Sequence, residues 1–100
     1  MIHFEDLWNK AEEYFKSTDP SMSPSSILEE IKMKATLYQT ITNNDKLSAE
    51  EKKKAKEMMF GRILSALTHL SLVEDINSFA ALQTAIEDLS IMKLKNEYEK

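Results

Sequence analysis

The stretch FGRILSALTHLSL, Phe60 to Leu72, decides the fold, because it is apolar on nearly every side of a helix. Together with Met58 and Met59 just before it, its apolar residues cover most of a helical circumference. A helix that is apolar all round must be surrounded by other protein. A chain of 100 residues has little room to enclose such a helix alone. We therefore predict a homodimer, in which a second copy covers part of this helix and its neighbours.

The segments that precede this stretch carry helical signals of their own. From Phe4 onward, apolar residues recur three and four positions apart, which is typical of an amphipathic helix. This first helix should end before Pro20, because a residue that precedes proline is disfavoured in a helix. A second helix should begin at Ser23 and Pro24, since serine caps free amides and proline suits the first helical position.

Capping residues also mark the boundaries of the two later helices. Ser48 and Glu51 form an S-x-x-E capping box. Asp75 and Asn77 interrupt the apolar pattern, because their side chains prefer local bonds to the backbone, and Asn77 or Ser78 can cap the next helix. The sequence thus predicts a single all-α domain over residues 1–100, with helices at about 3–17, 24–43, 49–72 and 78–95.

Composition narrows the classes of function. The net charge of −4 is spread along the chain, so neither DNA nor RNA is indicated as a partner. The absence of cysteine excludes disulfides and zinc–thiolate sites, and the single glycine excludes glycine-rich phosphate loops. No apolar run approaches the roughly 20 residues of a membrane span, and the first residues are acidic, unlike a signal peptide. We expect a cytoplasmic protein with no membrane contact.

Two stretches resemble the MazG-like all-α nucleoside triphosphate pyrophosphohydrolases. SILEEIKMKATLYQ, residues 26–39, resembles the E-E-x-x-E metal helix of that family. MMFGRILSALTHLSLVEDINSFAALQTAIEDL, residues 58–89, resembles its second half, including the glycine within a helix. The resemblance implies a four-helix MazG-like bundle, intertwined or packed as a homodimer. It also implies a magnesium site of acidic residues that holds a triphosphate while water attacks and pyrophosphate leaves.

Most of the acids that the resemblance requires are replaced in this chain. Glu29 and Glu30 match the paired glutamates, whereas Met33, Met59 and Arg62 stand where the family has acids. Thioethers cannot replace hard oxygen ligands, and a fixed guanidinium repels a divalent cation. We therefore predict no catalytic residue and no metal site, unless Glu29 and Glu30 retain some residual magnesium binding.

An internal polar pocket is predicted in place of the metal. Arg62 is expected to form a forked hydrogen bond with Glu29 or Glu30. His69 lies about two helical turns beyond Arg62 on a similar face and is expected to join the same pocket. Gly61 is expected to let the two long helices approach each other closely. These four polar residues, Glu29, Glu30, Arg62 and His69, form the predicted binding set.

Three functions remain open from the sequence. The first is a noncatalytic MazG-like homodimer, a pseudoenzyme without a cofactor that binds a nucleotide or a protein partner. The second is an active magnesium-dependent pyrophosphohydrolase that takes further acids from elsewhere, for example Glu57 and a partner chain. The third is a small phage-type helical adaptor or inhibitor that exposes Trp8, Tyr14 or Tyr38 to a protein partner.

Overall fold

The computed structural model describes residues 3–18 and 21–98, with side chains described as far as residue 93. These residues form four helices and no strand: α1 (Phe4–Thr18), α2 (Pro24–Thr42), α3 (Ala49–Val73) and α4 (Ser78–Tyr98). The all-helical prediction is confirmed, and the predicted starts at 24, 49 and 78 coincide with the observed ones. The predicted stop at Pro20 lies outside the described residues, although α1 ends close to it.

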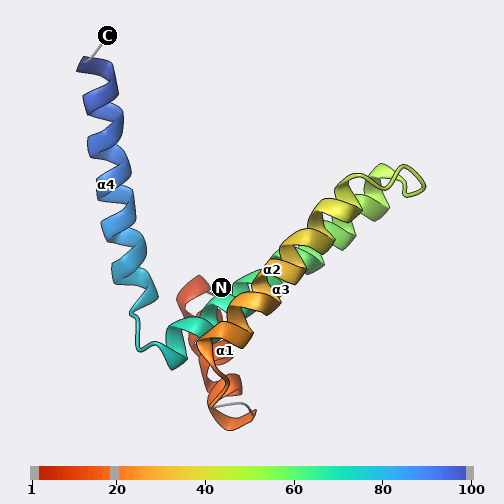
Figure 1. The fold of residues 1–100 in the computed structure, drawn as a ribbon, viewed down its shortest axis with the longest axis horizontal. Coiled ribbons are helices and arrows are strands. Elements are labelled where there is room, and N and C mark those ends of the chain that lie inside the picture. The colour runs from red at the N-terminus through yellow and green to blue at the C-terminus, as the bar shows by residue number, and fades with distance from the viewer. Residues whose placement is uncertain (1–2, 19–20, 99–100) are drawn as a thin grey trace.

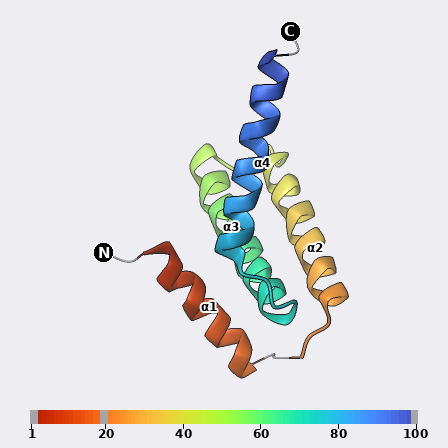
Figure 2. The same cartoon turned by 90° about the vertical axis from the view of Figure 1, so that its left-hand side faces the viewer.

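The body of the molecule is built on the antiparallel hairpin of α2 and α3, against which α1 packs (Figure 1). Turned by 90°, α1 and α2 are seen on opposite sides of α3 (Figure 2). Ile27 of α2 and Ala66 of α3 are the buried apolar residues of the described chain. This core is small for a chain of this length, because a compact domain buries most of its large aliphatic side chains.

Helix α4 projects away from the other three helices (Figure 1). Near its first turn Phe79 meets Trp8 of α1, with ring centroids 6.1 Å apart, but every side chain from Phe79 to Lys93 is exposed. The radius of gyration is 16.9 Å, whereas a compact chain of this length has about 13 Å. Within one chain, α4 therefore does not close a four-helix bundle. As a separate finding, no helix in the described part of the chain is long and apolar enough to cross a membrane.

The break between α3 and α4 has the geometry of a Schellman motif. The amide of Ile76 donates to the carbonyl of Ser71 over 2.9 Å, and the amide of Asp75 donates to Leu72 over 3.3 Å. Asp75 adopts a positive φ of 53°, the left-handed conformation that ends helices in this motif. The carboxamide oxygen of Asn77 then accepts hydrogen bonds from the first amides of α4. The break and the Asn77 cap predicted from the sequence are confirmed.

The predicted capping box at the start of α3 is also confirmed. The Ser48 hydroxyl accepts a hydrogen bond from the Glu51 amide over 3.1 Å, and the Glu51 carboxylate accepts one from the Ser48 amide over 3.0 Å. Hydrogen bonding of the Glu51 carboxylate to the Ser48 backbone, and then to the Ser48 side chain, lowers the pKa of Glu51 below its usual value of 4.5. The cap is thus strongest when Glu51 is ionised.

Removing this cap should weaken the protein in a pH-dependent manner. We expect Ser48→Ala to lower the free energy of unfolding at pH 7 by about 1 kcal/mol. Because the folded pKa of Glu51 is lowered, its contribution is present at neutral pH and is lost as the pH falls through that pKa. Urea unfolding at pH 7 and pH 3 measures this, with Glu51→Gln as the control that should lose the acid-sensitive component. Equal stability of Glu51→Gln and the natural chain at pH 7 would contradict it.

Candidate functional site

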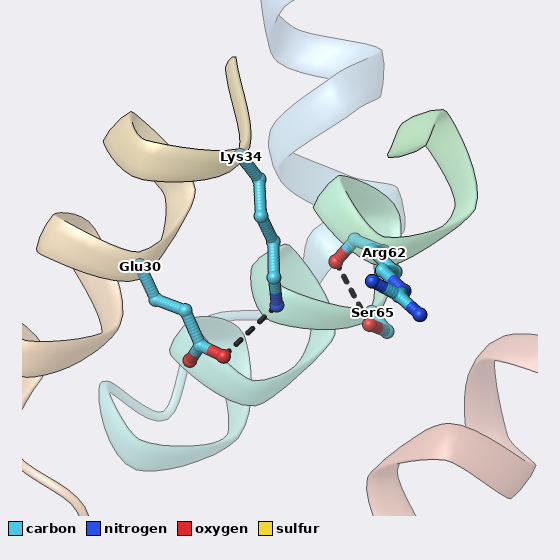
Figure 3. A network of polar contacts seen from close by, with 4 residues as sticks. All are labelled: Glu30, Lys34, Arg62 and Ser65. Carbon is cyan, nitrogen blue, oxygen red and sulfur yellow. Dashed lines mark hydrogen bonds and ion pairs between the residues drawn. The ribbon is translucent and has the colours of Figure 1, made fainter. Parts of the chain in front are cut away.

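The predicted polar pocket is replaced by a different ion pair on α2. The carboxylate of half-buried Glu30 pairs with the ammonium of Lys34, with Oε1 and Nζ 2.9 Å apart (Figure 3). Both residues lie on α2, one helical turn from each other. The sequence analysis missed Lys34, although its i,i+4 spacing from Glu30 is the signal that could have found it.

Arg62 does not reach either glutamate of the predicted site. Its side chain is exposed, and its guanidinium is directed away from Glu30 (Figure 3). Figure 3 shows a hydrogen bond at Arg62, but it involves the backbone carbonyl, which accepts from the Ser65 hydroxyl over 2.8 Å. Ile63, the next residue, lines the junction with α2, and one residue is about 100° around a helix. The predicted ion pair of Arg62 with Glu29 or Glu30 is therefore wrong for the single chain.

His69 belongs to the contact between α1 and α3. Its side chain is only 2% exposed. The imidazole stacks on the ring of Phe15 from α1, with centroids 4.1 Å apart and planes 8° from parallel. His69 is thus buried, but it lies in the contact that packs α1 against α3 and not in a pocket with Glu30.

Gly61 does not mediate a close approach of α2 and α3, contrary to the sequence prediction. The residue is exposed, and a Cβ atom added to it would meet no heavy atom within 4 Å. Its backbone has no positive φ that would require glycine. We therefore expect Gly61→Ala to raise the free energy of unfolding by about 0.5–1 kcal/mol, because alanine restricts the unfolded chain. Urea denaturation checks this, and a loss of stability would show that Gly61 is needed for a close contact in an assembly.

The described residues of one chain do not fit a magnesium ion. Among them, no group of three or more His, Asp or Glu side chains lies close enough to hold a metal. Glu29 is exposed, and the Glu30 carboxylate is paired with Lys34. Magnesium needs hard oxygen ligands in near-octahedral geometry. We derive no reaction step through a metal at this position.

The most distinctive surface of the molecule is one face of α4. The apolar side chains on this face are more than half exposed, although they recur at helical spacing as core residues do. We call the following set the α4 face: Leu82 (58% exposed), Ile86 (54%), Leu89 (62%) and Met92 (53%). In a soluble protein, a continuous apolar stripe of this kind marks an interaction site.

A second apolar surface lies between α2 and α3. A shallow cavity of about 340 Å³ is lined there by Ala35, Tyr38, Phe60 and Ile63, which we call the hairpin groove. Toward the turn of the hairpin, a neighbouring depression adds three lysines and one glutamate, namely Lys52, Lys53, Lys56 and Glu57. The ammonium of Lys56 lies 5.9 Å from the centre of the Tyr38 ring, within the range of a cation–π contact. The groove is thus apolar, and the depression beside it has more lysines than acids.

The whole chain exposes more surface than a compact protein of its mass. Its accessible surface is 8101 Å² for 11.5 kDa. Compact monomers of this mass expose about 5,800 Å² by the usual size scaling, so the excess is about 2,300 Å².

Comparisons with known proteins assign no family to the chain. Neither protein families, curated proteins nor solved structures gave a match. The resemblance to MazG-like hydrolases therefore stays a prediction that depends on the sequence pattern alone.

Proposed function

We propose that this protein is a homodimeric helical interaction protein without catalytic activity of its own. The observation that carries the proposal is the α4 face, whose apolar side chains no other described element of the chain covers. Water-exposed apolar area of this extent favours association by about 25 cal/mol for each Å² that becomes buried. A protein with such a stripe and an apolar groove on the same chain is built to bind other helices.

The amount of uncovered surface supports a stable homodimer. Two chains with an excess of about 2,300 Å² each bring about 4,600 Å² to an assembly. Obligate dimers bury about 2,000–5,000 Å² in total and have largely apolar interfaces. The excess of this chain is therefore of the size that a permanent dimer removes from water.

A protein partner suits the dimer better than a nucleotide does. Met33 and Leu37 of α2 are 60% and 45% exposed and share a surface depression with Glu29 and Lys32. Flexible thioether and aliphatic side chains adapt to protein surfaces, whereas one carboxylate beside one ammonium does not give the excess of cations that holds a triphosphate. We therefore favour a protein that binds at Met33 and Leu37 as the partner of the dimer.

The mass in solution tests the proposed function. Light scattering at micromolar concentration should give twice the chain mass of 11.5 kDa. A mass of one chain throughout this range would overturn the homodimer. The hydrolase alternative is tested separately by incubating the protein with nucleoside triphosphates and magnesium or manganese. We expect no pyrophosphate, and its release would show that the protein is an enzyme.

A further inference from the structure

We infer that α4 of each copy lies in the hairpin groove of the other copy, so that the two chains exchange their last helices. This inference rests on the proposed homodimer and specifies how it is built. The described part of α4 meets its own chain near the first turn, where Phe79 contacts Trp8. Beyond that point α4 projects away from its own hairpin, as Figure 1 shows.

The hairpin groove has the properties of a seat for a third helix. It runs between two antiparallel helices and is lined by apolar side chains, which is the surface that an added helix buries. Leu28 and Leu67 lie seven residues from Ala35 and Phe60 on the same helix faces, and they are 52% and 39% exposed. These residues extend the groove along the hairpin away from its tip.

Exchange covers both apolar surfaces in one closed arrangement. The α4 face spans about 15 Å, and the groove with its extension follows α2 from Leu28 to Tyr38, which is also about 15 Å. In a twofold dimer each groove receives one α4, so that the α4 face and the hairpin groove cover each other in both copies. Pairing of α4 with α4 would instead leave both grooves exposed. It would also depend on a stripe far shorter than the three to four heptads typical of a coiled coil.

The spacing of apolar residues fits either direction of the exchanged helix, and the parallel direction is the one we infer. Leu82 and Leu89 of α4 are seven residues apart, as are Leu28 and Ala35 of α2. If α4 runs parallel to α2 of the other copy, one register brings Leu82 to Leu28 and Leu89 to Ala35.

The charges at the hairpin tip favour the same direction. An α4 that runs parallel to α2 brings its carbonyl end toward the turn between α2 and α3. Lys52, Lys53 and Lys56 lie near this turn and outnumber the one acid of the same depression, Glu57. Cations stabilise the negative end of a helix dipole, whereas the opposite direction would place the positive end there.

Chemical bridging of introduced thiols tests the exchange, since the chain has no cysteine of its own. Chains with Leu89→Cys are mixed in denaturant with chains that carry Ala35→Cys and a distinguishing tag, refolded together, and treated with a short bismaleimide. This bridge tolerates a few ångströms of misregister better than a disulfide does. We expect a covalent product of one tagged and one untagged chain, and the same from Leu82→Cys with Leu28→Cys.

Ile91→Cys, on the opposite side of α4, is the matched control. It is expected to bridge to Ala35→Cys about tenfold less than Leu89→Cys does, because two residues turn a helix by about 200°. Bridging of Leu89→Cys chains to one another in a sample of dimeric mass would show pairing of α4 with α4. That result, or a dimeric mass without the mixed product, would overturn the exchange but leave the homodimer intact.

A double variant with Ala35→Cys and Leu89→Cys distinguishes exchange from folding back. Exchange predicts bridges between chains and a covalent dimer. A bridge within one chain, in a sample whose mass is that of a monomer, would show that α4 folds onto its own hairpin. Both the exchange and the proposed homodimer would then be wrong.

Discussion

Ile86→Glu should convert the dimer into a monomer at micromolar concentration, with a dissociation constant raised at least about a hundredfold. Ile86 lies in the middle of the α4 face and is 54% exposed in the single chain. In the proposed dimer the new carboxylate would be buried without a partner, which disfavours association by several kcal/mol. A twofold dimer contains the substitution twice, so the effect doubles. Sedimentation or light scattering over a dilution series measures the shift.

Ile91→Glu is the matched control for this prediction. It makes the same chemical change on the same helix, at a side chain that is 64% exposed and lies about 140° around α4 from Ile86. We expect its dissociation constant to stay within a few-fold of the natural value. Glutamate is a good helix former, so both variants should keep their helical circular dichroism. A dimer that survives Ile86→Glu would show that the α4 face is not the interface.

The helix boundaries could be predicted because the residues that set them act locally. Ser23 caps α2 through the amide of Ser26, and Ser48 and Glu51 cap α3 through each other's amides. Asn77 does the same for α4. A cap satisfies amides only two or three residues away, so the sequence contains all the information that such a boundary needs.

The predicted site failed because it depended on how two helices are rotated against each other. A stripe of apolar residues shows which side of a helix is buried, but it does not fix the rotation within about one residue, or 100°. At that resolution Arg62 could face α2 or solvent, and the structure places it in solvent. The residue that pairs with Glu30 lies on the same helix instead, since Lys34 follows it by four residues.

The sequence predicts a second copy from the apolar circumference of α3, but in the structure α4 has the larger uncovered apolar surface. Helix α3 is covered in part by α2 and α1, and it contains most of the buried residues of the described chain. The apolar residues of α4 have the spacing of a core helix, yet they remain exposed. Periodicity predicts that a face is buried, but it does not tell which chain covers it.

Ile27→Ala should cause the largest loss of stability of any single substitution considered for this chain. Ile27 is a fully buried side chain at 0% exposure and anchors the small core of the hairpin. Truncation of a buried isoleucine to alanine lowers the free energy of unfolding by about 2–5 kcal/mol, through lost burial and the cavity left behind. Domains of this size are stable by about 5–15 kcal/mol in total. Urea unfolding followed by circular dichroism measures the loss.

Leu28→Ala, at the neighbouring position, gives this prediction its control and connects it to the dimer. Leu28 is 52% exposed in the single chain, so in the monomeric Ile86→Glu background its truncation should lower stability much less than Ile27→Ala does. In the proposed dimer, where α4 of the other copy covers Leu28, the loss should increase toward that of a buried leucine. Ile27→Ala should be severe in both backgrounds, because Ile27 is buried within one chain. A mild effect of Ile27→Ala in the monomeric background would mean that the hairpin is not the stable unit of the fold.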